Sequence, residues 1–297
     1  MPPLLRPAAD EDVPAIVELA RAADDARVIS VEGVLQRLRT APEHMRLLNL
    51  VADDEGRVVA TGTAGLDTFA GPGTGWANVS VAADRRREGI GSALGAALLD
   101  HLRSLGVTTV TTFMRQTDEG ERWATARGWQ RALAGPLIAV DPRVVPPPEL
   151  PDGFRCATLD GLTPEAVYDA AREAAFDEPT AVPREEFPFD EFARDWQDPD
   201  LDLASSAAVL DGDRVVAFSF LKVGGDRAQH GFTGTARDYR GRGLATAAKR
   251  HALHTAAARG VIRVTTSNAE ENAAMRAINR RLGFEPIGEH VILGRSL

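Results

Sequence analysis

Two short segments of this sequence carry glycines and arginines at the same spacing. They read Arg86-Arg87-Glu88-Gly89-Ile90-Gly91 and Arg240-Gly241-Arg242-Gly243-Leu244-Ala245. A strand-like run precedes each segment and a helix-like run follows it, so several backbone N–H groups should point at one place where a helix begins. The helix dipole adds partial positive charge there, and the arginines add full charges. Both segments therefore predict a phosphate-binding loop.

The sequence around the loops is also repeated. Gly89 and Gly243 lie 154 residues apart, and nearly the same offset relates several flanking segments. The matched segments are Arg57–Ala60 with 214–217, Gly106-Val107 with 260–261, Val110–Thr112 with 264–266, and Gly128-Trp129 with 283–284. An offset that drifts by so few residues indicates a duplicated domain. We expect domains at 1–142 and 152–297, joined by a proline-rich linker at 143–151.

Hydrophobic periodicity predicts the same order of elements in both halves. In the first half we expect helices at 10–21, 31–38, 90–105 and 119–127, and strands at 47–52, 58–66, 76–81, 107–114 and 137–140. In the second half we expect helices at 163–175, 244–259 and 272–282, and strands at 207–210, 215–223, 230–236 and 261–267. Each glycine-rich loop thus lies in the middle of its domain.

The two loops resemble the acyl-CoA-binding signature of the GNAT superfamily of N-acetyltransferases, Arg/Gln-x-x-Gly-x-Gly/Ala. The signature falls within 79–91 and 233–245, and Leu282-Gly283-Phe284 after the last helix matches as well. One glycine motif is weak evidence, but the ordered set of elements, present twice, is strong. The resemblance covers nearly the whole chain. It implies an α/β (α+β) fold with two domains, each a mixed, mostly antiparallel, V-splayed sheet flanked by helices.

The resemblance also implies acetyl-CoA, or another acyl-CoA, as the ligand of the loops, with its pantetheine arm in the split of the sheet. In the second domain the implied binding residues are Thr233, Gly234, Thr235, Arg240, Gly241, Arg242, Gly243, Leu244, Ala245, Asn268 and Asn272. In the first domain they are Val81, Arg86, Arg87, Gly89, Ile90 and Gly91. Met114 and Asp118 replace the two asparagines in the first domain. We therefore expect the second domain to be the catalyst and the first to be structural or regulatory.

The usual general acid of the family, a tyrosine four residues before the last glycine motif, is absent. Asn279 and Ala124 take its place in the two domains. Asn279 could still donate a hydrogen bond to sulfur. The candidate bases for the acceptor amine are His230 and the carboxylates of Asp177, Glu178 and Glu270. Acidic residues and phenylalanines interleave over 176–190, where Asp177, Glu178 and Phe187 predict contacts with a cationic amine that carries apolar surface.

Several alternatives stay open at this stage. Asn272 could be a helix N-cap, His230 a surface histidine at a strand end, and the acidic segment a solvated loop whose phenylalanines fill the core. A non-catalytic acyl-CoA-binding protein is the main rival function, and acetylation of a protein amine is another. A dinucleotide-binding fold is disfavoured, because its glycine motif lies near the start of a parallel βαβ unit.

The composition limits the other functional classes. The net charge of −9 argues against a nucleic-acid surface, and no apolar run approaches a membrane span. The single cysteine, Cys156, rules out an internal disulfide and suggests a core filler. We expect a small-molecule amine as the partner, with no nucleic acid, membrane or metal. A cytoplasmic monomer or homodimer is the simplest expectation.

Overall fold

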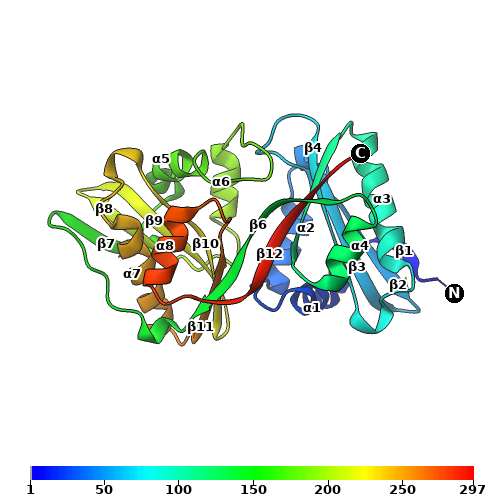
Figure 1. Ribbon diagram of the computed structural model, residues 1–297, viewed down its shortest axis with the longest axis horizontal. Helices are drawn as coiled ribbons and strands as arrows, with labels where there is room; N and C mark the ends of the chain where they lie inside the picture. The colour runs from blue at the N-terminus through cyan, green and yellow to red at the C-terminus, as the bar shows by residue number, and fades with distance from the viewer. Residues whose placement is uncertain (1) are drawn as a thin grey trace. The chain divides into compact units, whose positions relative to one another are not determined.

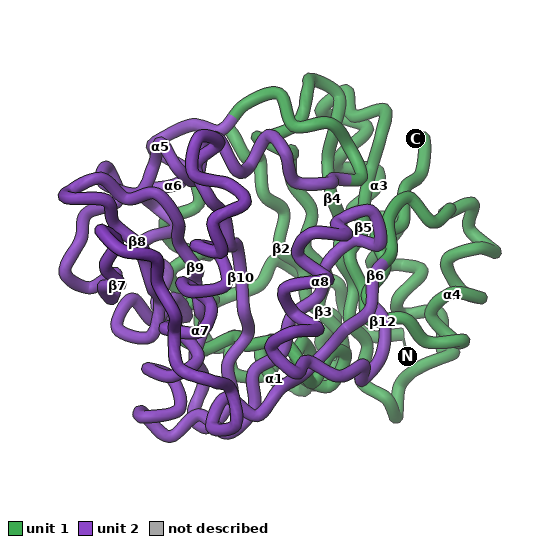
Figure 2. Tube along the Cα trace, turned by 60° about the vertical axis from the view of Figure 1, so that its left-hand side comes forward, with its two compact units in different colours: residues 1–134, 181–186, 290–297 green, residues 135–180, 187–289 purple. Residues whose placement is uncertain are grey.

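The computed structural model describes residues 2–297 and divides into two compact units. Unit 1 comprises residues 1–134, 181–186 and 290–297, and unit 2 comprises 135–180 and 187–289 (Figure 2). Each unit thus takes segments from both halves of the sequence. Among the described residues no helix is long and apolar enough to cross a membrane.

The strands of unit 1 lie in the order β1-β2-β3-β4-β5-β12, and all of them except β5 are labelled in Figure 1. They are β1 (Leu4–Pro7), β2 (Leu48–Asp54), β3 (Arg57–Leu66), β4 (Thr74–Val81), β5 (Thr109–Arg115) and β12 (Glu285–Ser296). All neighbours are antiparallel except β4 and β5. Residues 290–296 of β12 pair with β5, and Val291 and Leu293 enter the hydrophobic core of this unit.

The strands of unit 2 lie in the order β6-β11-β10-β9-β8-β7. They are β6 (Gln130–Val140), β7 (Phe154–Thr158), β8 (Ala207–Asp211), β9 (Arg214–Gly224), β10 (Arg227–Thr235) and β11 (Arg263–Ser267). Here β10 and β11 form the parallel pair, and residues 137–140 of β6 pair with β11. The closing strand of each half of the sequence therefore completes the sheet of the other half.

The parallel pair in each unit is short, because its strands soon diverge. Thr74–Trp76 pairs with 109–111, and Arg227–Gln229 pairs with 263–265; no further pair follows. On β10 the register with β9 also shifts between His230 and Thr233, as at a β-bulge. The expected splayed, mostly antiparallel sheet is thereby confirmed in both units.

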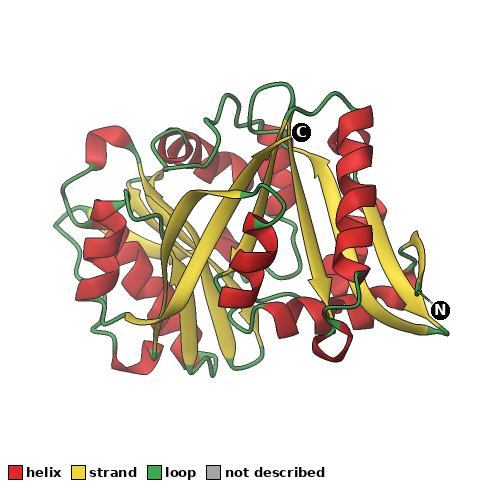
Figure 3. Ribbon diagram, turned by 45° about the vertical axis from the view of Figure 1, so that its right-hand side comes forward, coloured by secondary structure: helices red, strands yellow, loops and turns green. Residues whose placement is uncertain are grey.

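Helices cover both faces of the sheet in unit 2 (Figure 3). The helices of the chain are α1 (Val13–Ala23), α2 (Val31–Thr40), α3 (Ile90–Ser104), α4 (Asp118–Thr125), α5 (Pro164–Ala175), α6 (Phe189–Asp195), α7 (Leu244–Ala258) and α8 (Ala273–Arg281). Successive strand residues point to opposite faces. Phe218 of β9 packs with α5, whereas its neighbour Ala217 packs with α7. These two helices therefore lie on opposite faces.

The proline-rich stretch between the two halves is anchored to unit 2. Residues 146–150 have no regular structure, yet the carbonyl of Val145 lies 2.7 Å from His254 Nε2 and that of Pro147 accepts from Arg250 at 3.3 Å. Both partners belong to α7. The domain limits at 142 and 152 describe the two copies of the duplicated sequence and stay a prediction. The compact units have different limits, because β6 and β12 are exchanged between the two halves.

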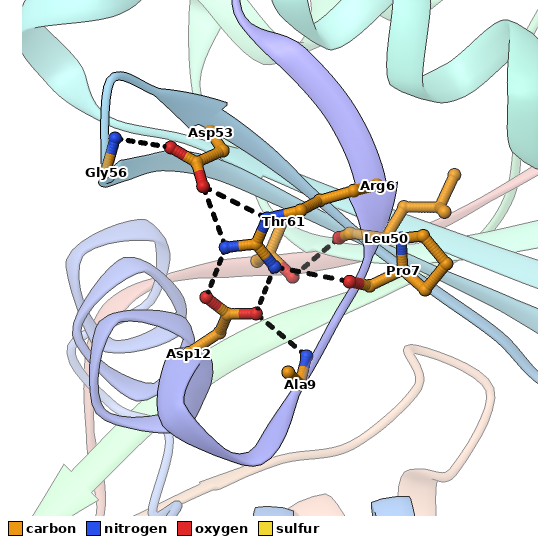
Figure 4. A network of polar contacts seen from close by, with 8 residues as sticks. All are labelled: Arg6, Pro7, Ala9, Asp12, Leu50, Asp53, Gly56 and Thr61. Atoms are coloured by element: carbon orange, nitrogen blue, oxygen red, sulfur yellow. Dashed lines mark hydrogen bonds and ion pairs between the residues drawn. The ribbon is translucent and has the colours of Figure 1, made fainter.

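Arg6 on β1 ties the first strand of unit 1 to two neighbouring elements (Figure 4). Its guanidinium donates to Asp12 at 2.7 Å and to Asp53 at 2.8 Å. The Arg6 guanidinium lowers the pKa of both carboxyls. Asp12 is also held by the backbone N–H of Ala9 at 2.8 Å. This network fixes the sheet edge and lies apart from either loop in sequence.

Candidate functional site

The two glycine-rich loops have the same backbone conformation. Gly89 and Gly243, which precede α3 and α7, have φ of 86° and 80°. The second position of each loop is also left-handed, with φ of 69° at Arg87 and 77° at Gly241. Glycine adopts such angles without strain, whereas arginine does so at a cost. The second loop is thus the less strained copy of one shape.

Backbone N–H groups in both loops are available to a ligand. Within the described chain, no hydrogen bond is made by the N–H groups of Arg87–Ile90 or of Gly241–Leu244. A Cβ added at Gly241 or Gly243 would meet nothing within 4 Å. Open space beside unpaired N–H groups at the start of a 15-residue helix is the arrangement that binds phosphate.

The first arginine of each signature folds back onto the end of its strand. Arg86 Nε donates to the carbonyl of Val81 at 3.4 Å, and Arg240 Nε donates to that of Thr235 at 3.2 Å. The matching contacts show that the likeness between the loops extends to side chains.

In unit 2 the loop arginines are paired with carboxylates at the end of α5. Asp177 accepts from Arg240 at 2.6 Å and from Arg237 at 3.3 Å, and Glu173 accepts from the backbone N–H of Arg237 at 2.7 Å. Arg240 lowers the pKa of the Asp177 carboxyl, with a smaller effect from Arg237. The structure thus places Asp177, a predicted base and substrate contact, at the second glycine-rich loop. Sequence analysis missed Arg237 and Glu173, since only their spatial proximity to the loop reveals them.

The three asparagines of the second half play different parts. Asn279 is 1% exposed, and its Nδ2 donates to Asn268 Oδ1 at 2.6 Å. Asn272 caps α8 by accepting from the N–H of Met275 at 3.1 Å. The helix-cap role weighed for Asn272 is thus present, while Asn268 and Asn279 form a pair. The Oδ1 atom of Asn279 is buried and has no partner among the described residues.

Gly135 of β6 packs closely against the backbone of Asn268, one member of this asparagine pair. A Cβ at this position would lie 1.9 Å from the carbonyl oxygen of Asn268. No real contact is that short, so any side chain would displace the end of β11. No motif in the sequence indicates this role.

His230 is a buried residue of unit 2, so the alternative of a surface histidine is wrong. It is 4% exposed, and its Nδ1 lies 3.2 Å from Ser219 Oγ and 3.3 Å from the carbonyl of Phe220. Its register partner on β9, Leu221, packs with residues of α7, so His230 is on the α7 face. Burial, together with the charge of Lys249, sets its pKa well below the ordinary value. The imidazole is therefore neutral at pH 7.

The other predicted contacts are dispersed. Phe187 stacks on Tyr168 with ring centroids 5.9 Å apart, in an aromatic group that also contains Phe192 and Phe220. Glu178 and Glu270 are exposed. Gly234 is needed for packing, because a Cβ there would lie 2.4 Å from Ala174 Cβ of α5. Thr233 Oγ1 lies 2.9 Å from Ser219 Oγ.

A side chain closes the split between the strands of unit 1. Asn78 Oδ1, on β4, accepts from Thr112 Oγ1 at 3.0 Å and from the N–H of Phe113 at 3.2 Å, both on β5. The residue at the matching offset in unit 2 is Phe232. The two units therefore share a loop but differ in the split beside it.

The profile of the acetyltransferase (GNAT) family matches residues 17–125 and again 165–284. The chain belongs to the GNAT family. A tandem GNAT protein from the clavulanic acid biosynthesis pathway, in a structure without AcCoA, is 25% identical with a TM-score of 0.77 over 99% of this chain and 98% of that one. A GCN5-related N-acetyltransferase from Sphaerobacter thermophilus is 21% identical with a TM-score of 0.72, covering 99% and 95%. No curated protein matches the chain.

These matches establish a tandem GNAT fold and membership of an acetyltransferase family. In residues 2–297 there is no cluster of three or more histidine, cysteine, aspartate or glutamate side chains that could hold a metal. Cys156 is a free thiol whose pKa burial raises to about 11, so it is a poor nucleophile at pH 7.

Proposed function

We propose that this chain is an acyl-CoA-dependent N-acyltransferase, with acetyl-CoA as the donor and the primary amine of a small molecule as the acceptor. Unit 2 is the proposed catalyst. The observation that carries this is the second loop, where two unstrained left-handed glycines and a row of unpaired N–H groups adjoin strands that separate after three residue pairs.

The residues of unit 2 fit the phosphates and arm of CoA. The N–H groups of Gly241–Leu244 would hold the pyrophosphate, and Arg240 and Arg237 would add charge once released from Asp177. The gap between β10 and β11 would take the pantetheine arm. When bound, the cofactor supplies an acyl group activated as a thioester.

The bulge on β10 supplies candidate donors for an oxyanion. The register shift between His230 and Thr233 leaves Gly231 and Phe232 without partners in the β9 ladder. We propose their N–H groups as donors to a developing negative charge, which rigid backbone dipoles stabilise well. Attack then needs an uncharged amine held in place.

The aromatic group on α5, α6 and β9 is the proposed wall for the apolar part of the acceptor. The ring centroids of Tyr168, Phe187 and Phe192 lie within 6 Å of one another, and the hydroxyl of Tyr168 donates to the carbonyl of Phe187 at 2.5 Å. Such a preformed apolar surface orients a ligand without losing much conformational entropy.

A non-catalytic acyl-CoA-binding protein is the second candidate. It is favoured by Asn279, which replaces the family's tyrosine and already donates to Asn268 at 2.6 Å. A thiol-release assay with acetyl-CoA and a panel of amines separates the two functions. Release of free CoA that depends on the amine supports the enzyme, and binding without release supports the alternative.

Substitution of the two loops tests which unit is the catalyst. Gly243→Val adds a branched side chain at φ 80° beside the proposed phosphate, so we expect at least a tenfold loss of acetyl-CoA affinity and turnover. Gly89→Val is the matched change in unit 1 and should leave turnover within about twofold. Equal losses from both would contradict the assignment to unit 2.

A further inference from the structure

Lysine is almost absent from this chain. Of 34 lysine and arginine residues, only Lys222 and Lys249 are lysines. The side chain of Lys222 is 37% exposed and pairs with Asp198 at 2.7 Å, whereas Lys249 is 1% exposed. Lysine can lose its proton when buried, but arginine cannot. The buried residue Lys249 is thus one of the two side chains among these 34 that can lose their proton.

No carboxylate faces Lys249. Its Nζ lies 5.6 Å from the ring centroid of Phe284, and within the described residues it makes neither an ion pair nor a hydrogen bond. Desolvation lowers its pKa from 10.5 to about 7. The charge of Lys249 in turn lowers the pKa of His230, which is itself buried. The site therefore lacks a counter-charge, and a buried ammonium without one is destabilised by several kcal/mol.

His230 adds a second unmatched nitrogen to this site. Its Nδ1 contacts Ser219 and Phe220, but its Nε2 is buried without a partner. Buried polar atoms are nearly always paired in folded proteins. Lys249 Nζ and His230 Nε2 are thus two nitrogen atoms without a hydrogen-bond partner among the described residues.

Unit 1 shows that the fold does not require these groups. Gly95 stands at the position of Lys249, and Trp129 at that of Phe284. Ala77 stands at the position of His230, since it pairs with Ala64 of β3 as His230 pairs with Leu221 of β9. Unit 1 keeps the same strand, loop and helix with no titratable side chain at any of these positions. The buried polar pair is therefore a property of unit 2, the proposed catalyst.

The pair lies where the split in the sheet of unit 2 begins. His230 directly follows Gln229, the last residue of β10 that pairs with β11. From there to Ala236, one residue beyond the end of β10, the chain spans at most roughly 20 Å at 3.3 Å per residue. That is about the length of an extended phosphopantetheine arm. A ligand held by the loop could therefore bring its far end to this point.

We propose that Lys249, assisted by His230, binds a carboxylate group of the ligand of unit 2. A carboxylate would give the ammonium its missing counter-charge and accept from the imidazole in its Nε2–H form. It could belong to the acyl group of the donor, as in a dicarboxylic acyl-CoA, or to the amine acceptor, as in an amino acid. This inference rests on the proposed function, since it specifies the ligand of the same site.

Calorimetric binding of CoA, acetyl-CoA and succinyl-CoA at pH 7 tests the donor as the source. We expect the wild type to bind succinyl-CoA roughly 10- to 100-fold more tightly than acetyl-CoA, the value of one charge-assisted hydrogen bond. Lys249→Met should abolish the difference, and Lys249→Arg should keep part of it. Lys222→Met is the matched control and should change nothing. Thermal unfolding verifies that each variant is folded.

The acceptor is tested as the source in parallel, by thiol release with amino acids and with their decarboxylated amines. A preference for amino acids that Lys249→Met removes also supports the proposal. The absence of both preferences in the wild type, or an equal loss of all ligands in Lys249→Met, overturns it. Failure of every CoA derivative to bind would instead contradict the proposed function itself.

Discussion

At the scale of single residues, Asp177 binds the arginines that we propose for the phosphates, so it should compete with the ligand for them. Its carboxylate occupies both loop arginines, Arg240 at 2.6 Å and Arg237 at 3.3 Å, and all three side chains are about half exposed. Exposed ion pairs are weak, so a doubly charged pyrophosphate should displace Asp177 readily. Until the ligand binds, Asp177 would thus hold Arg237 and Arg240 in place beside the loop.

Asp177→Asn should therefore strengthen CoA binding. Without the competing charge, we expect a two- to fivefold lower Kd at low salt, corresponding to up to about 1 kcal/mol for an exposed pair. Calorimetry at two salt concentrations checks this. Asp141→Asn breaks a comparable pair with Arg143 outside the loops and should leave Kd unchanged. A weaker affinity in Asp177→Asn would assign Asp177 to ligand binding instead.

Gly135 is the residue whose substitution should disturb the site most without touching the ligand. Because a Cβ would lie 1.9 Å from the Asn268 carbonyl, Gly135→Ala must move β11 or β6. We expect a loss of about 1–3 kcal/mol in the free energy of unfolding, as overpacking usually gives. Gly161→Ala adds the same atom where nothing lies within 4 Å and serves as control. Equal unfolding free energies for the two variants would argue against this packing role.

At the scale of elements, the two loops predict opposite effects of opposite changes at one shared backbone conformation. Arg87 has φ 69° where unit 2 has a glycine with φ 77°. Arg87→Gly should raise the free energy of unfolding by up to about 1 kcal/mol, and Gly241→Ala should lower it by a similar amount. Urea unfolding measures both. If Arg87→Gly destabilises the protein, the arginine side chain holds the loop by contacts stronger than the strain.

Helix α7 predicts a dependence of stability on pH through Lys249. The folded-state pKa is about 7, below the ordinary 10.5, so the unfolded state binds more protons between these values. Stability should therefore rise as pH increases from 7 to 10.5, by at most about 1.4 kcal/mol per pH unit. The pKa of His230 is also lowered, so His230 adds a rise in stability as pH increases toward 6.5, its ordinary pKa.

Lys249→Met should flatten the rise above pH 7 and increase the stability at pH 7, since a buried apolar side chain needs no counter-charge. Chemical unfolding from pH 6 to 9.5 checks this, with Lys222→Met expected to keep the wild-type slope. A Lys249→Met variant with the wild-type slope would show that another group controls it.

At the scale of the whole molecule, the strand exchange makes each unit dependent on both halves of the sequence. The last residues of the chain complete the sheet of unit 1, where Val291 is 1% exposed and His290 Nε2 donates to Asp24 at 2.9 Å. Residues 137–140 complete the sheet of unit 2 in return. Neither half contains every strand of a compact unit.

Deletion of residues 290–297 should therefore destabilise unit 1 more than unit 2. Hydrogen exchange should show lost protection in β5, whose residues 109–115 pair with the deleted strand. Amides of β8 and β9 provide the internal control, because both of their partners remain. Unchanged protection in β5 would mean that this strand is held without the exchange.

The sequence predicted the family, both loops and the order of the main elements, because these depend on local signals. Glycine at Gly241 and Gly243 sets the backbone of the loop whatever lies around it. Of the strand at 130–140 only residues 137–140 were predicted, and the strand at 285–296 and α6 were missed. Such segments take their structure from distant partners.

Tertiary structure decided the rest. Asp177 meets Arg240 across 63 residues, Gly135 meets Asn268 across two strands, and the partnerless burial of Lys249 is visible only when α7 is packed on its sheet. The exchange of β6 and β12 is likewise a pairing of strands far apart in sequence. Local propensity cannot encode such contacts, because each depends on which apolar faces and strand edges remain to be covered once the chain is compact.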